Sequence, residues 1–240
     1  MPVNPSSMFS TRIAFDIETQ PNPAAVASMP EPEVKCGNLK DPVKIAEKIR
    51  EAKEEQASRA ALDPHFGRVV CISIAHQTDK EFVQTLIRQD VAHEGVDAAE
   101  HTLLKWFWDY IRAISDHAQI ITFNGASFDV PFLTRRSRLL GIRPVHINCH
   151  PYQVVDPTCE HFDVYRYLDE TGTGNPCNVK KNLRFYCREF LGRDIGYAEL
   201  DKSTIGEMFD RGEHEAIERI CKNDVLATLE LAERLLSVGV

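Results

Sequence analysis

Two carboxylates stand two residues apart in an otherwise apolar stretch of the sequence, TRIAFDIE at residues 11–18. Residues two apart on a β-strand project from the same face, so we expect Asp16 and Glu18 to point together. Burying two like charges side by side is costly unless cations or hydrogen-bond donors offset them. The alternative for so short a motif is a solvated pair of acids at the end of a strand. The pair is therefore a candidate metal-binding site.

Two further acids stand beside apolar sequence later in the chain. Asp129 follows a short apolar run and the turn-forming tetrapeptide Asn124-Gly125-Ala126-Ser127, whose glycine permits a tight turn and close backbone approach. Asp224 lies in CKNDVLAT on the helix expected at 214–236, in a segment whose apolar residues are suited to packing in the core. An aspartate on a helix is nevertheless more often at the surface. With Asp16 and Glu18 they supply the hard oxygen ligands that two Mg²⁺ or Mn²⁺ ions require.

Three segments carry a resemblance to a known family: IAFDIET, ITFNGASFDVPFL and ICKNDVLAT. They resemble the three motifs of the DEDD 3′–5′ exonucleases, and more specifically the predicted exonucleases related to the proofreading domain of family B DNA polymerases. The resemblance covers most of residues 11–236. It implies a ribonuclease H-like fold, two divalent cations as cofactors (Mg²⁺ or Mn²⁺), and nucleic acid as the partner, with single-stranded DNA preferred. The implied reaction releases nucleoside 5′-monophosphates from a 3′ end.

The same resemblance assigns roles to individual residues. The four metal-binding catalytic acids correspond to Asp16, Glu18, Asp129 and Asp224. Asp16 would bridge the two cations, Glu18 and Asp224 would hold the cation that carries the attacking water, and Asp129 would serve the second cation. Asn124 and Phe128 would approach the terminal nucleotide. We also expect two further motif residues, Thr19 and Gly125, to bind the substrate.

The sequence departs from this family at the residue that positions or deprotonates the water. Members usually have a tyrosine four residues before the last aspartate or a histidine five before it, and here those positions hold Ile220 and Arg219. Neither residue is a general base. Three explanations stay open: activation of the water by a cation alone, recruitment of His214, Tyr186 or Tyr197, and a slow or inactive enzyme.

The charge distribution favours a local contact with nucleic acid. The chain has 28 basic and 36 acidic side chains and a net charge of −8, which argues against binding duplex DNA by overall electrostatics. Residues 130–155 contain no acid and four arginines, Arg135, Arg136, Arg138 and Arg143. We expect Arg135 and Arg136 to bind phosphates of the entering strand. A second basic cluster comprises Lys180, Lys181, Arg184 and Arg188, and a solvated helix face is the alternative for both clusters.

Hydrophobic periodicity and turn residues predict an α/β domain with a mixed central sheet flanked by helices. Strands are expected at 11–18, 67–75, 81–87 and 119–123, and helices at 41–62, 97–115, 127–141, 178–192 and 214–236. We expect a flexible leader at 1–10 and one domain at 11–240. The proline-rich stretch at 21–42 predicts a loop or lid, and the insertion at about 31–63 is interpreted as decoration or a lid.

Several classes of protein are disfavoured by the sequence. No apolar run approaches the roughly 20 residues that span a bilayer, and the N-terminal residues lack a secretory signal pattern, so we expect a cytoplasmic protein. Seven cysteines without a C-x-x-C pair indicate neither a disulfide framework nor a zinc knuckle. Besides the DNA exonuclease, an RNA or oligonucleotide exonuclease and a catalytically silent nucleic-acid-binding or regulatory module stay open.

Overall fold

A computed structural model describes residues 9, 11–37, 40–77, 83–87, 96–114, 118–148, 159–169, 181–195 and 204–238. Within these residues a five-stranded sheet has the order β3-β2-β1-β4-β5. The strands are β1 (Thr11–Pro21), β2 (Gly67–His76), β3 (Val83–Ile87), β4 (Ala118–Thr122) and β5 (His161–Asp163). The central strand β1 is antiparallel to β2 and parallel to β4. The mixed sheet predicted from the sequence is confirmed.

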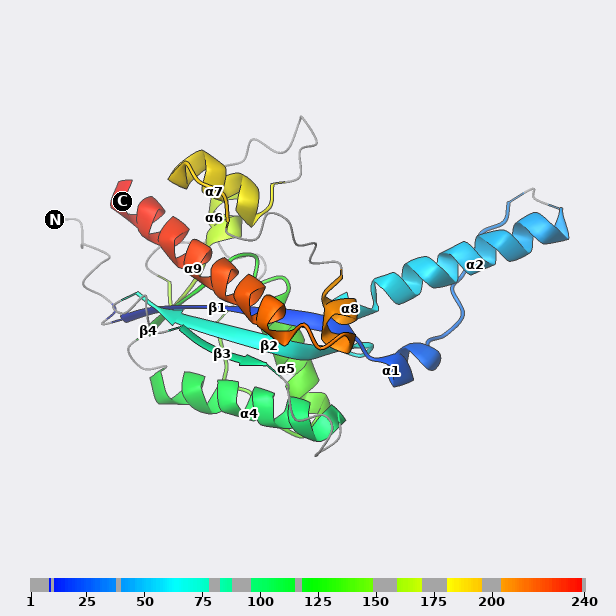
Figure 1. Ribbon diagram of the computed structural model, residues 1–240, viewed down its shortest axis with the longest axis horizontal. Helices are drawn as coiled ribbons and strands as arrows, with labels where there is room; N and C mark the ends of the chain where they lie inside the picture. The colour runs from blue at the N-terminus through cyan, green and yellow to red at the C-terminus, as the bar shows by residue number, and fades with distance from the viewer. Residues whose placement is uncertain are drawn as a thin grey trace.

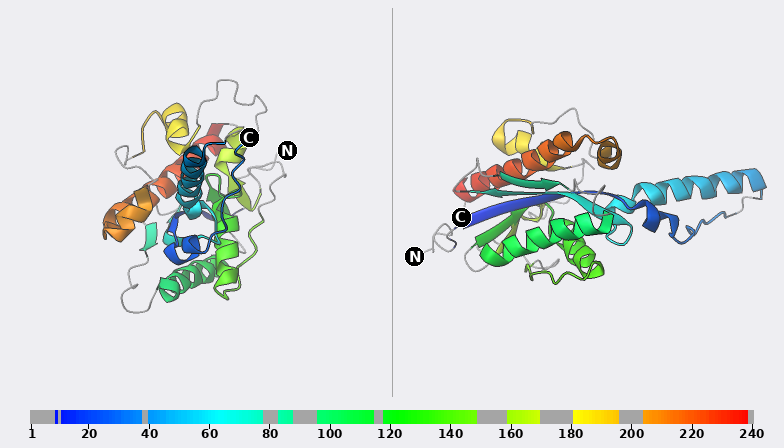
Figure 2. Two further views of the ribbon diagram at one scale, coloured as in Figure 1. Left: turned by 90° about the vertical axis from the view of Figure 1, so that its right-hand side faces the viewer. Right: turned by 60° about the horizontal axis from the view of Figure 1, so that its bottom comes forward.

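Helices cover both faces of this sheet (Figures 1 and 2). On one face lie α4 (Val96–Ile114) and α5 (Asp129–Leu139), and on the other lie α6 (Val164–Asp169), α7 (Leu183–Leu191) and the long α9 (His214–Val238). The alternation along β1 follows from this arrangement. Ile13, Phe15 and Ile17 are buried in the cluster that includes α4 and α5, whereas Ala14 is buried in the cluster of α7 and α9. Residues 16 and 18 share the face of Ala14, so they point towards α9.

The predicted helix at 41–62 is present as α2 (Pro42–Ser58), followed by the short η2 (Ala60–Leu62). Asp41 caps it by accepting a hydrogen bond from the Val43 amide at 3.0 Å, and Pro42 occupies the first turn. None of its residues is buried. The helix projects beyond the end of the sheet in both sets of views (Figures 1 and 2), so it does not lie across the face that carries residues 16 and 18. The lid interpretation is therefore not supported by this arrangement.

Four short elements were not predicted: α1 (Pro23–Ala27), β5, α6 and α8 (Ile205–Asp210). The helix α1 forms inside the proline-rich segment because Asn22 accepts a hydrogen bond from the Ala24 amide and Pro23 occupies the first turn. The strand β5 has three residues, which is too short for periodicity to reveal. Among the helices that the structure describes, none combines the length and the apolar composition needed to cross a membrane.

Candidate active site

The two acids of β1 lie together under α9. The carboxylate oxygens of Asp16 and Glu18 and the Sγ atom of Cys221 on α9 are all within 4.8 Å of one another. The side chain of Glu18 is 5% exposed and Asp16 is partly buried. Two carboxylates this close repel each other in a medium of low dielectric constant, so a cation between them would relieve a real electrostatic cost.

A β-bulge lies beside Glu18. The pairing of β1 with β2 shifts register between Glu18 and Thr19: Glu18 is opposite Cys71, whereas Thr19 is opposite Val69. The extra residue, Val70, is buried together with Cys71 in the cluster formed with α8 and α9. A bulge bends the strand locally and re-aims side chains, and bulges are common next to active sites. Here the extra residue belongs to β2, so β2 bends opposite the position of Glu18.

The thiol of Cys221 donates towards Asp16. Its Sγ atom is 3.4 Å from the Asp16 carbonyl oxygen and 3.9 Å from Asp16 Oδ2. Burial raises the pKa of the Cys221 thiol well above its ordinary value, and the neighbouring Cys71 thiol and the charge of Asp16 raise it further. Cys221 therefore stays protonated beside the acids and adds a donor instead of a third negative charge.

Asp129 contacts β1 at the edge that faces β4. The pairing of β1 with β4 covers only Thr11–Ala14, so the edge of β1 beyond Ala14 is open on the β4 side. The chain leaves β4, turns at Asn124 with φ at +65°, and begins α5 at Asp129. There the Ile17 amide donates a hydrogen bond to Asp129 Oδ1 at 3.2 Å. The buried Asp129 thus meets the main chain between Asp16 and Glu18.

A residue that the sequence did not single out, Asp163 on β5, holds this turn. Its Oδ1 accepts a hydrogen bond from the Asn124 amide and its Oδ2 accepts one from the Ala126 amide, both at 2.9 Å. Burial raises the pKa of Asp163, and these amide bonds counteract the increase. The turn also requires a glycine, since a Cβ atom at Gly125 would stand 2.5 Å from Cβ of Thr122. No motif in the sequence marks Asp163 as a partner of the turn.

Asp224 is buried on the sheet-facing side of α9. It is 4% exposed and follows Cys221 by three residues, which places both on one face of the helix. The alternative of a surface aspartate is therefore excluded. The close cluster around Asp16 and Glu18 receives Cys221 from this helix, and Asp224 lies one turn further along it.

The positions usually held by a catalytic tyrosine or histidine do not offer a base. Ile220 is fully buried among Val70, Ile205 and other apolar residues, and Arg219 is exposed. His214 packs against Phe209 with ring centroids 5.0 Å apart, and it precedes Cys221 by seven residues, about 10 Å along the helix axis.

The other two candidate bases are not assigned to the site. Tyr186 lies in the apolar cluster beneath α7, edge-on to Phe123 and Tyr165. Burial is the main reason that the pKa of Tyr186 is raised. Its Oη atom has no hydrogen-bond partner within the residues that the structure describes. Tyr197 falls outside the described residues.

Two of the substrate-binding predictions are changed by side-chain contacts. Arg136 is buried and forms a bidentate pair with Glu100, with Nε 2.9 Å from Oε1 and Nη2 2.8 Å from Oε2. The prediction that Arg136 binds phosphate is therefore wrong, because its guanidinium group is buried and paired with Glu100. The Thr19 hydroxyl donates to the Ala61 carbonyl at 2.7 Å, which gives it a structural role next to the bulge. Phe128 is partly buried against Phe132, with centroids 5.6 Å apart.

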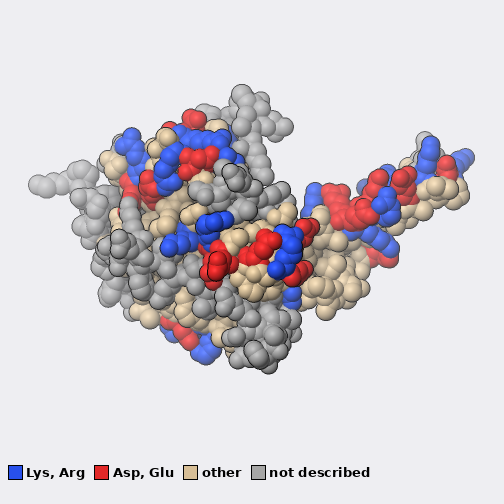
Figure 3. Space-filling view, in the orientation of Figure 1, with Lys and Arg blue, Asp and Glu red and all other residues tan. Residues whose placement is uncertain are grey.

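The second basic cluster is compensated by an acid. Arg184 and Arg188 on α7 both bind Asp194. The hydrogen bond from Arg184, followed by that from Arg188, lowers the pKa of Asp194 to about 2. Acidic and basic side chains are interspersed over α7 and along α2 (Figure 3). This surface is an ion-pair network, and Lys180 lies outside the described residues.

A mixed sheet with helices on both faces and acids on its central strand defines a ribonuclease H-like fold, and the similarity to known proteins agrees. Residues 60–152 match the family described as "Predicted 3'-5' exonuclease related to the exonuclease domain of PolB". This part of the chain is thus similar to the exonuclease domains of family B polymerases, in agreement with the resemblance of the motifs. The matched range contains Asp129, whereas Asp16, Glu18 and Asp224 lie outside it.

Individual relatives are DNA polymerases much longer than this chain. A DNA polymerase of Pyrococcus glycovorans is 35% identical over 77 residues, which is 32% of this chain and 10% of that protein. DNA polymerase 1 of Sulfurisphaera ohwakuensis is 27% identical over 113 residues, or 42% of this chain and 12% of that protein. The solved family B DNA polymerase of Pyrobaculum calidifontis superposes with a TM-score of 0.61 at 20% identity, covering 94% of this chain and 24% of the polymerase. The chain spans about a tenth of the length of these curated relatives.

Proposed function

We propose that this chain is a 3′–5′ exonuclease that hydrolyses nucleotides from the 3′ end of single-stranded DNA with two divalent cations, Mg²⁺ or Mn²⁺. One observation carries the proposal: Asp16 and Glu18 offer carboxylate oxygens within 4.8 Å of each other on the central strand, with Glu18 buried. The relation to polymerase exonuclease domains supplies the reaction class.

The donor set suits hard cations. Carboxylate oxygens are the ligands that Mg²⁺ and Mn²⁺ prefer, and the protonated thiol of Cys221 is a poor ligand for either ion. Asp16 and Glu18 would hold the metal, and Asp129 and Asp224 would complete the set from α5 and α9. When bound, the cations activate water for attack and stabilise the leaving 3′ oxygen. The protein's own contribution is to fix the acids, through the strand β1 and the hydrogen bond from the Ile17 amide to Asp129.

The residues around Asp129 fit an unpaired 3′ end. Phe128 directly precedes Asp129, and its ring rests against Phe132, which would give the terminal base a fixed aromatic surface for stacking. Asn124 and Gly125 lie at the turn held by Asp163. A single-stranded end reaches such a site without the cost of opening a duplex.

The test uses the direction of digestion. Single-stranded DNA labelled at its 5′ end should shorten stepwise with Mg²⁺ or Mn²⁺, whereas DNA labelled at its 3′ end should release labelled mononucleotide at once. Chelation with EDTA should stop both reactions. Asp16→Asn and Asp224→Asn should abolish digestion, and the matched control is Asp210→Asn, at an exposed position on α8. Wild-type rates in Asp16→Asn would overturn the assignment, and digestion of RNA alone would change the substrate.

A second function, a nucleic-acid-binding module without turnover, is favoured by the burial of Ile220 at the position where the exonuclease family that the motifs resemble usually has a tyrosine. The same labelled strands separate the two functions. Binding that is measured by fluorescence anisotropy, together with unshortened strands after long incubation with either cation, would select the silent module.

A further inference from the structure

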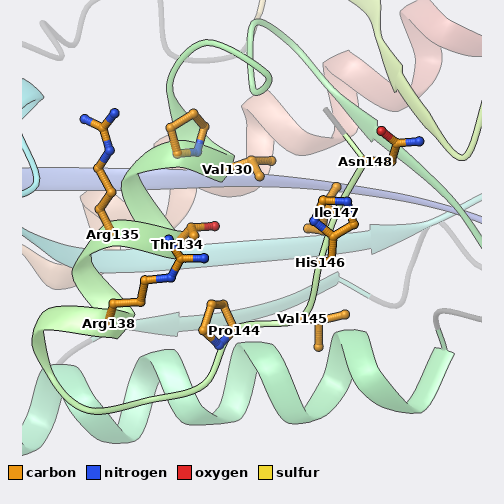
Figure 4. Close-up of a pocket in the computed structure, with 10 residues that line it drawn as sticks. Val130, Thr134, Arg135, Arg138, Pro144, Val145, His146, Ile147 and Asn148 are labelled. Carbon is orange, nitrogen blue, oxygen red and sulfur yellow. The ribbon is translucent and has the colours of Figure 1, made fainter. Parts of the chain in front are cut away.

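A groove runs along the outer side of α5. It has a volume of about 350 Å³ and lies between the helix face from Val130 to Arg138 and the extended segment Pro144–Asn148 (Figure 4). Figure 4 shows side chains from both walls, including Arg135, Arg138 and His146. The groove begins beside Val130, the residue after Asp129, so it starts next to the candidate active site and leads away from it.

The polar groups of the groove are unbalanced in charge. Arg135 and Arg138 are exposed, and neither has an ion pair or hydrogen bond within the part of the chain that the structure describes. Arg136, between them, is buried and paired with Glu100. Among the described residues that line the groove there is no aspartate or glutamate. In a protein of net charge −8, a groove whose described lining has two arginines and no acid is suited to an anion.

The rest of the described lining is mixed: Thr134, His146 and Asn148 are polar, and the other residues are apolar. The apolar residues include Pro131, Pro144, Val145 and Ile147. Arginines beside apolar surface fit a ligand that alternates phosphates with flat bases, which describes single-stranded nucleic acid. We infer that this groove holds nucleotides of the single-stranded substrate several positions to the 5′ side of the scissile bond. The inference rests on the proposed function.

Helix geometry gives the reach of this subsite. Arg135 and Arg138 follow Asp129 by six and nine residues, which is about 9 and 14 Å along the helix axis at a rise of 1.5 Å per residue. A stacked strand advances about 3.4 Å per nucleotide. The two arginines therefore meet the strand roughly three to four nucleotides from its 3′ end. A dinucleotide does not extend that far.

Binding without metal isolates the groove from catalysis. The affinity for a 5′-fluorescent strand of twelve deoxythymidines is measured by anisotropy in EDTA over a series of salt concentrations. If each arginine neutralises one phosphate, Arg135→Gln/Arg138→Gln lowers the slope of log K against log salt by about 1.4, since each phosphate on a single strand contributes about 0.7. Arg143→Gln is the matched control, because Arg143 is exposed and lies outside the groove. An unchanged slope in the double variant, or an equal loss in the control, overturns the inference.

Substrate length supplies the second readout. With Mg²⁺, the double variant should raise KM for the twelve-nucleotide strand and leave KM for the deoxythymidine dinucleotide unchanged. An equal rise for both lengths would show that the arginines act at the terminal nucleotide, and it overturns a remote subsite. If thymidine 5′-monophosphate displaces the long strand from wild type but not from the double variant, the groove is a mononucleotide site. That result also overturns the inference. If wild type cleaves neither strand, the proposed function fails, whereas the binding measurement in EDTA still decides the groove.

Discussion

The buried pair between Arg136 and Glu100 gives the sharpest prediction on stability. Glu100 is fully buried, and its Oε1 atom accepts a hydrogen bond from the Val69 amide as well as from Arg136 Nε. The pair thereby joins α4 and α5 to β2. Arg136→Met removes the cation and leaves a carboxylate without its counter-charge in the core. Breaking a buried pair on one side typically costs about 3–5 kcal/mol, because the remaining charge is not compensated.

A second substitution should recover much of that loss. Glu100→Gln combined with Arg136→Met removes both charges, and the glutamine oxygen still accepts the Val69 amide. Replacing a buried ion pair with neutral groups of similar volume is often close to neutral in stability. We therefore expect the double variant to be more stable than Arg136→Met alone by at least about 2 kcal/mol.

The measurement is urea-induced unfolding followed by tryptophan fluorescence, since Trp108 is fully buried and its Nε1 donates to Ser137 on α5. Midpoints and slopes are compared among wild type, both single variants and the double variant. A loss below about 1 kcal/mol for Arg136→Met, the range of an exposed pair, would refute the assignment of Arg136 to the core. Binding of single strands by the variants should keep the wild-type salt dependence at temperatures where they are folded, in contrast to Arg135→Gln/Arg138→Gln.

Three other residues near the site give predictions of their own. Gly125→Ala places a Cβ atom 2.5 Å from Thr122, so we expect a loss of about 1–3 kcal/mol in the free energy of unfolding measured in urea. The loss of turnover should be larger than this loss of stability explains, and normal turnover would contradict the prediction. Burial lowers the pKa of His161 to about 4, below its unfolded value, so the free energy of unfolding should fall by roughly 3 kcal/mol as pH decreases from 6.5 to 4. His161→Gln should flatten that dependence, and an unchanged profile would exclude His161 as its source. Cys221 should resist alkylation at pH 8 while the partly exposed Cys36 reacts, as mass spectrometry of the peptides can check, and equal rates would contradict its burial.

Local signals in the sequence were sufficient for most of the fold. The alternation in β1 and the Asp41-Pro42 start of α2 are short-range patterns, and the structure has both elements. The predicted helices at 127–141 and 178–192 end in glycines, which favour helix ends, and both have a left-handed backbone, with φ of +75° at Gly141 and +66° at Gly192. The strand β5 was missed because three residues hold no period, and its place in the sheet depends on pairing with β4.

The candidate site was predictable only where it depends on local geometry. Asp16 and Glu18 share a face because a strand repeats every two residues. Cys221 contacts Asp16 across a separation of 205 residues, and nothing near either residue specifies that contact. The prediction for Arg136 was wrong for the same reason, since its partner Glu100 lies 36 residues earlier and the two meet only when α4 and α5 pack on the sheet. An arginine in a basic run and an arginine in a buried pair look alike in sequence.

Different parts of the fold hold the acids of the site, so a local change can displace one acid without the others. The pair on β1 is fixed by the strand and by its pairing with β2, whereas Asp129 depends on the turn that Asp163 holds from β5. A change confined to the turn therefore shifts Asp129 while leaving the oxygens of Asp16 and Glu18 together. In the proposed mechanism two cations assist attack and departure. If it holds, such a change should reduce turnover far more than it reduces binding of a cation at Asp16 and Glu18. Loss of β1 packing should instead remove metal binding and turnover together, so the ratio of the two effects reports which support has failed.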